Sequence, residues 1–116
     1  MTRDDFIQYC KDHYPAVVDR PFMKFPDYVA LRHPDGKWFA VVMNVPAAKM
    51  GLLGDGELDI VDLKCDPELN SILQAQPNFR PGYHMNKAHW LTALLPAFKS
   101  AEELGELIDG SYEATR

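Results

Sequence analysis

Apolar residues recur along this chain with two different spacings, and each spacing predicts a different kind of element. Helical spacing marks three segments, each preceded by a residue type that caps helices: Thr2 before residues 3–14, Asp66 before 67–76 and Ser100 before 101–112. Ser100 and Glu103 have the spacing of a capping box. In the second helix we expect Leu69, Ile72 and Leu73 to form the buried stripe.

Residues 27–45 have the period-two alternation of a β-hairpin. The turn between its strands is His-Pro-Asp-Gly at 33–36, in which Pro34 restricts one dihedral and Gly36 takes the strained one. The second strand of the hairpin is apolar on both sides. It is therefore expected to lie centrally, with both faces of the sheet covered.

Two further strands are predicted, at 57–65 and in the segment around 89–95. The apolar alternation of the first shifts between Ile60 and Val61, which favours a β-bulge there. Residues 15–27 hold three prolines and are expected to form a loop with aromatic anchors.

The expected order is α-β-β-β-α-β-α, which predicts an α+β fold in which helices pack on an antiparallel sheet. A length of 116 residues suits a single domain, residues 1–116, that needs neither a metal nor a disulfide to fold. Cys10 and Cys65 are expected to be free, buried thiols. No apolar run is long enough to span a membrane and the N-terminus has no apolar signal core, so we expect no membrane association and a cytoplasmic location.

The charge is unevenly distributed along the chain. The formal net charge is -5, which disfavours strong non-specific binding of nucleic acid. However, residues 20–49 carry five Lys or Arg against two Asp, and residues 80–99 carry three Lys or Arg against no acid. If these two segments are neighbours in space, they form a basic face on an acidic protein.

The segment PGYHMNKAHW at 81–90 is the densest in side chains that can bind or catalyse. Its two histidines are five positions apart, a spacing that puts them on different sides of a helix or a strand, so no metal site and no cofactor is expected. The chain has no nucleophile elbow and no phosphate-binding glycine loop, so we expect no enzymatic activity. We expect Asn86 to form a turn, Trp90 to anchor the core, and Lys87 to remain free for a partner.

PGYHMNKAHW resembles the signature of the MmcQ/YjbR family of small bacterial proteins. The segments RPF at 20–22, GKWFAVV at 36–42, DLKCDPE at 62–68 and LIDGSY at 107–112 are similar to stretches of the same family. The resemblance implies a fold similar to that of the frataxin-like CyaY proteins. It also implies DNA binding through a proposed double wing motif.

Together these features predict a monomeric, non-enzymatic binding protein whose partner is DNA. The residues expected to contact DNA or another anion lie in the two basic segments: Lys24, Arg32, Lys37, Arg80, His84, Asn86, Lys87 and His89. The alternative is an adaptor module that recognises a protein or a small anionic ligand and has no role in nucleic-acid binding.

Overall fold

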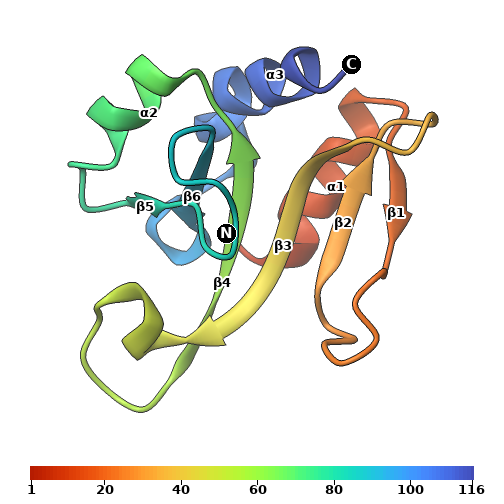
Figure 1. The fold of residues 1–116 in the computed structure, drawn as a ribbon. Coiled ribbons are helices and arrows are strands. Elements are labelled where there is room, and N and C mark those ends of the chain that lie inside the picture. The colour runs from red at the N-terminus through yellow and green to blue at the C-terminus, as the bar shows by residue number, and fades with distance from the viewer.

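Six strands pair into one antiparallel sheet in the computed structural model, which describes residues 1–116 (Figure 1). The strands are β1 (Val17–Asp19), β2 (Val29–Arg32), β3 (Trp38–Pro46), β4 (Glu57–Lys64), β5 (Phe79–Pro81) and β6 (Trp90–Leu94). The helices are α1 (Arg3–His13), α2 (Pro67–Leu73) and α3 (Gly105–Ala114), with short 3-10 segments η1 (Ala47–Met50), η2 (Leu95–Ala97) and η3 (Ala101–Leu104). The predicted α+β class with an antiparallel sheet is confirmed.

The sheet order is β1-β2-β3-β4-β6-β5, so two short strands missing from the predicted element order form its edges. Val17 of β1 pairs with Arg32, and Phe79 of β5 pairs with Ala93. Three residues are too few to show a periodicity, and the prolines two positions from either end of β1 and within β5 suggest a loop. Pairing with a neighbouring strand therefore defines these edges, and the predicted order was incomplete.

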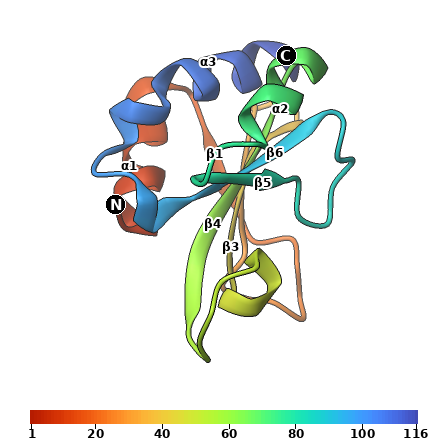
Figure 2. The same cartoon turned by 90° about the vertical axis from the view of Figure 1, so that its left-hand side faces the viewer.

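The two faces of the sheet have different covers (Figure 2). Helices α1 and α3 lie on one face, over a cluster of 16 buried residues that includes Phe39 and Val42. On the other face, the loop between β1 and β2 and the loop between β5 and β6 cover a smaller cluster of seven, which includes Val41 and Met43. We call this second side the loop face. The prediction that the second hairpin strand is covered on both faces is confirmed.

Strand β4 has no bulge, contrary to the expectation. Its register with β3 runs without a break from Ala40↔Leu63 to Pro46↔Glu57. Ile60 and Val61 are both buried because Ile60 packs in the loop-face cluster and Val61 in the helix-face cluster. A strand covered on both sides loses its alternation without any irregularity of the backbone.

The predicted helix starts are confirmed, whereas the predicted buried stripe of α2 is wrong for Leu69 and Ile72 and holds only for Leu73, which packs partly buried against the helix-face cluster. Thr2 and Ser100 each form a capping box, and the Asp66 carboxylate accepts hydrogen bonds from the first-turn N–H groups of α2. Leu69 and Ile72 are 42% and 64% exposed, and Asn70 is the buried residue of this helix.

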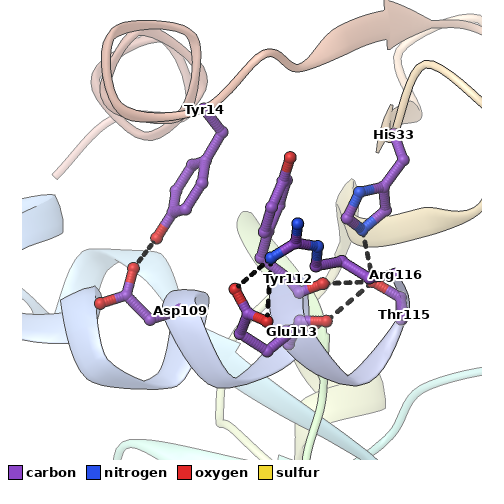
Figure 3. A network of polar contacts seen from close by, with 8 residues as sticks. Tyr14, His33, Asp109, Tyr112, Glu113, Thr115 and Arg116 are labelled. Carbon is purple, nitrogen blue, oxygen red and sulfur yellow. Dashed lines mark hydrogen bonds and ion pairs between the residues drawn. The ribbon is translucent and has the colours of Figure 1, made fainter.

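The C-terminal helix is fastened to the rest of the chain by polar contacts (Figure 3). The Tyr14 hydroxyl donates a hydrogen bond to Asp109, and His33 Nε2 lies 2.8 Å from the Thr115 hydroxyl oxygen. The His33 ring also lies 4.1 Å from the Tyr112 ring, centroid to centroid. His33 is therefore part of the packing between the hairpin turn and α3.

Candidate functional site

The segment 82–89 joins β5 to β6 as a loop whose backbone is held by its own side chains. The side-chain oxygen of Asn86 (Oδ1) accepts hydrogen bonds from the backbone N–H groups of Ala88 and His89, at 2.9 and 3.2 Å. Gly82 lies so close to Trp90 that a Cβ atom at position 82 would sit 2.8 Å from Trp90 Cβ. Asn86 thus forms the expected turn, and only glycine fits at position 82.

Asn70, on α2, holds the end of this loop from outside. Its side-chain amide nitrogen donates to the backbone carbonyls of Lys87, Ala88 and Trp90, at 3.3, 3.1 and 3.0 Å. Sequence reasoning missed Asn70, because it lies between the apolar residues of a short helix. Its only sequence signal is a polar side chain at a position adjacent to the expected buried stripe.

Two of the predicted binding cations have structural roles instead. Arg80 donates to the backbone carbonyls of Met50, Pro77 and Phe79, at 2.8, 2.9 and 2.7 Å. The Lys87 ammonium donates to the backbone carbonyl of Gly82. The expectation that Lys87 remains free was therefore wrong, because the loop brings backbone carbonyls of its own residues within reach of the ammonium.

The other predicted binding residues differ in whether their side chains are exposed and free to contact a partner. Arg32 lies 3.5 Å from the Asp19 carboxylate, while Lys24 and Lys37 are exposed. His84 and His89 are exposed as well. Their rings do not converge with a third ligand, and no group of three His, Cys, Asp or Glu side chains is placed to hold a metal ion.

Trp90 is half-buried and belongs to neither hydrophobic cluster, so it is not the expected core anchor. Its neighbours in the strand, Leu91 and Ala93, point into the helix-face cluster. The alternation of the strand directs Trp90 to the loop face, beyond the end of the smaller cluster. Trp90 therefore has its backbone packed on Gly82 while its ring keeps access to solvent.

The two basic segments meet at a cavity on the loop face, which we call the aromatic pocket. Its volume is about 280 Å³, and eight of its ten lining residues are hydrophobic. Five of them are aromatic: Phe22, Phe25, Tyr28, Trp38 and Tyr83. The expected proximity of the two segments is thus seen in the structure. What they share is a set of aromatic rings, and only His84 of the predicted binding residues is part of the wall.

The rings of the aromatic pocket contact one another. Phe25 stacks on Tyr28 with ring centroids 4.7 Å apart, and Phe22 lies 5.8 Å from Tyr28 and 5.4 Å from Trp38. Phe25 is 51% exposed and Tyr28 is 8% exposed, so the pocket runs from an open edge to a buried interior. Such contacts hold the walls of the pocket in place before any ligand arrives.

A buried carboxyl group, that of Asp62 on β4, also lines the aromatic pocket. Asp62 is 0% exposed, and its Oδ1 atom accepts a hydrogen bond from the Thr92 hydroxyl. Thr92 in turn accepts from the Tyr83 N–H at 2.9 Å. Oδ2 of Asp62 has no hydrogen-bond partner. Burial raises the pKa of Asp62 to about 7, against smaller opposing effects of the Thr92 hydrogen bond, the nearby Tyr83 backbone N–H and the Lys87 charge.

An antiparallel sheet with helices on one face and a ligand-sized pocket on the other defines this chain as a small α+β protein with a preformed cavity. The family model named YjbR matches residues 12–114, and the chain belongs to the YjbR family. The family resemblance read from PGYHMNKAHW is confirmed.

Two relatives match along nearly the whole chain. YyaQ of Bacillus subtilis (strain 168) is 40% identical over 117 residues, which cover 100% of this chain and 99% of YyaQ. YjbR of Escherichia coli (strain K12) is 30% identical over 115 residues, which cover 97% of this chain and 86% of YjbR. Both proteins are described as uncharacterized, so they support the family and carry no activity to this chain.

Solved structures support the fold. A crystal structure of a Pseudomonas syringae protein matches with a TM-score of 0.94 and 45% identity, covering 100% of both chains. A crystal structure of a Deinococcus radiodurans protein matches with a TM-score of 0.68 and 29% identity, covering 96% of this chain and 75% of that one. The same fold is therefore seen in relatives whose sequences have diverged considerably.

Proposed function

We propose that this protein is a binding protein, without enzymatic activity, that takes a small organic ligand into the aromatic pocket. The observation that carries the proposal is the pocket itself. Segments far apart in the sequence, 22–28 and 83–85, meet with β3 and β4 to surround about 280 Å³ with aromatic rings. This volume lies near the lower limit of known ligand sites and suits a small molecule.

The chemistry of the wall supports binding more than catalysis. Eight hydrophobic residues offer contact area, whereas a catalytic site needs an acid, base or nucleophile held in a defined geometry. His84, at the wall, is exposed, and its ring centroid lies 4.0 Å from that of Tyr83. No carboxylate accepts a hydrogen bond from the His84 ring to orient it as a catalytic base. The sequence also allowed an adaptor module that binds a small anionic ligand. The pocket does not support this alternative, because the acidic group in its wall, the carboxyl of Asp62, would repel an anion.

The test is a screen of small organic molecules by amide chemical shifts of the ¹⁵N-labelled protein. Hits that bind in the aromatic pocket are expected to shift the resonances of residues 22–28, 38–43 and 83–85 together. Phe25→Ala should weaken these hits, and Leu53→Ala, an equally apolar change at a residue 101% exposed and outside the pocket, should leave them unchanged. If hits map elsewhere, or if the Leu53 variant weakens them as much, the pocket is not the binding site.

DNA binding is the second candidate, and one observation favours it. The two segments with net positive charge are adjacent, and Lys24 and Lys37 project from the surface near rings on which an unstacked base could stack. Three other predicted cations, Arg32, Arg80 and Lys87, contact the protein itself, which weakens this candidate.

A titration of duplex and single-stranded DNA at low salt tests this second candidate. Lys37→Glu is expected to weaken binding and reduce the salt dependence, whereas Lys11→Glu, on the helix face, should have less effect. Equal effects of the two variants would indicate only a general dependence on net charge. The likeness to CyaY proteins, the double wing motif, the monomeric state and the cytoplasmic location remain predictions.

A further inference from the structure

The feature of the aromatic pocket that hydrophobic binding alone leaves unexplained is the carboxyl group of Asp62. It lies on the same side of the sheet as Ile60, a member of the loop-face cluster, and opposite Val41, another member, where an apolar side chain would pack without any polar requirement. One of its oxygen atoms is satisfied by Thr92 and the other is not. Buried polar groups without a partner are rare in native proteins.

No cation of the protein forms an ion pair with Asp62. The ion pairs of the chain are Arg32 with Asp19 and Arg116 with Glu113. The positive charge that acts on Asp62 is that of Lys87, whose ammonium donates to backbone carbonyls of the 82–89 loop. The carboxylate therefore lacks the counter-charge that buried ions normally have.

The rings around this carboxyl group favour the same sign of ligand charge. The face of an aromatic ring is the negative end of its quadrupole, and cations bind over it. Five rings line the pocket beside one carboxyl group: Phe22, Phe25, Tyr28, Trp38 and Tyr83. Phe25 and Tyr28 stack on each other, so each of these two keeps one face for a ligand. A set of rings with one carboxylate resembles, in its chemistry, the sites that hold methylated ammonium groups.

We propose that the aromatic pocket binds an organic cation of the methylated-ammonium type, held over the ring faces and attracted by the Asp62 carboxylate. This inference rests on the proposed ligand-binding function of the pocket and names the class of ligand. Attraction across a pocket of low dielectric constant requires no direct contact with Oδ2, so a quaternary ammonium without N–H groups qualifies.

Other ligand classes fit the pocket less well. An anion would meet both the carboxylate and the negative ring faces. A divalent metal ion needs several oxygen ligands, and the pocket wall offers a single carboxyl group. A neutral apolar molecule fills the space but brings no positive charge to balance the Asp62 carboxylate.

The experiment compares two probes of the same shape, choline and its uncharged carbon analogue 3,3-dimethyl-1-butanol, by titration at pH 8 with amide chemical shifts as the readout. Choline is expected to bind at least about tenfold more tightly than the neutral analogue. Asp62→Asn should remove most of this difference by weakening choline alone. Phe25→Leu, which keeps an apolar side chain at an exposed position, should also weaken choline more than the analogue.

A pH series separates the charge of Asp62 from its shape. Choline carries no titrating group, so its affinity is expected to rise between about pH 6 and pH 8 as the carboxyl group ionises. The other titratable groups facing Asp62 are Lys87, His84, Tyr28 and Tyr83. Repeating the series with His84→Gln should preserve the rise, whereas Asp62→Asn should abolish it.

The outcomes distinguish this inference from the proposed function. Equal binding of choline and its neutral analogue in the pocket overturns the inference and leaves a ligand-binding pocket. If choline and tetramethylammonium shift no pocket resonance at about 10 mM, the inference is also wrong, whatever the screen finds. Failure of every molecule in the screen to reach the pocket removes the proposed function itself.

Discussion

The carboxyl group of Asp62 makes a prediction about stability that needs no ligand. Its pKa is about 7 in the folded protein, raised by burial from an ordinary value of 3.8. The folded state therefore holds this proton more strongly than the unfolded state, and the free energy of unfolding falls as pH rises from about 4 to about 7. Above pH 7 the loss is complete.

The magnitude follows from the size of the pKa difference. A difference of about three pH units, at about 1.4 kcal/mol for each, corresponds to about 4 kcal/mol. Asp62→Asn keeps the shape of the side chain and an oxygen atom that can accept from Thr92, but it cannot ionise. The variant should therefore be more stable than the original protein at pH 8.5 by up to about 4 kcal/mol, and close to it at pH 4.5.

Urea denaturation of both proteins at these two pH values measures the effect. Differences between the two proteins cancel the titration of other acids, such as Asp5, whose pKa is lowered by the Thr2 hydrogen bonds. Asp55→Asn, at an exposed carboxyl group, is the matched control and should change stability by less than ~0.5 kcal/mol at either pH. A destabilisation by Asp62→Asn that is equal at both pH values would show that the charge is not the costly feature, and the reasoning would be refuted.

Four other substitutions test how the pocket and its supporting loop are built. Gly82→Ala should destabilise by about 1–3 kcal/mol because the new Cβ meets Trp90 at 2.8 Å. Its control, Gly110→Ala, lies in open space on α3 and should stabilise by up to ~1 kcal/mol. Similar melting temperatures for the two variants would contradict the close packing at Gly82. Asn70→Ala should cost about 2–3 kcal/mol and speed hydrogen exchange of the 82–89 loop, and a loop that exchanges as before would rule out its anchoring role. Asp66→Ala should cost about 1 kcal/mol through the lost cap, and an unchanged urea midpoint would count against it.

Features that depend on a few adjacent residues were predictable from the chain. A cap acts within one helical turn, so Thr2, Asp66 and Ser100 mark the helix starts that the structure shows. The turn at 33–36 needs a residue that tolerates positive φ, and Gly36 has φ of 103°. The two-sided burial of β3 follows from its apolar residues on both sides.

The candidate site was predictable only in part. The signature segment predicted the family and the Asn86 turn, but the burial of Asp62 was missed. The signal was present, since Asp62 interrupts the apolar run of a strand and alternates with Ile60. We interpreted the change at Ile60 and Val61 as a bulge, and this obscured a carboxyl group placed between two covered faces.

The sequence by itself determined the helix caps, the hairpin turn, the α+β class and the family, because each depends on neighbouring residues or on a contiguous motif. Only the tertiary structure decided which charged groups are available. Arg80 reaches a carbonyl thirty positions away at Met50, and Lys87 folds back onto its own loop. Long side chains take whatever acceptors the fold brings near, and a pocket exists only where distant segments meet, so neither can be inferred from local spacing.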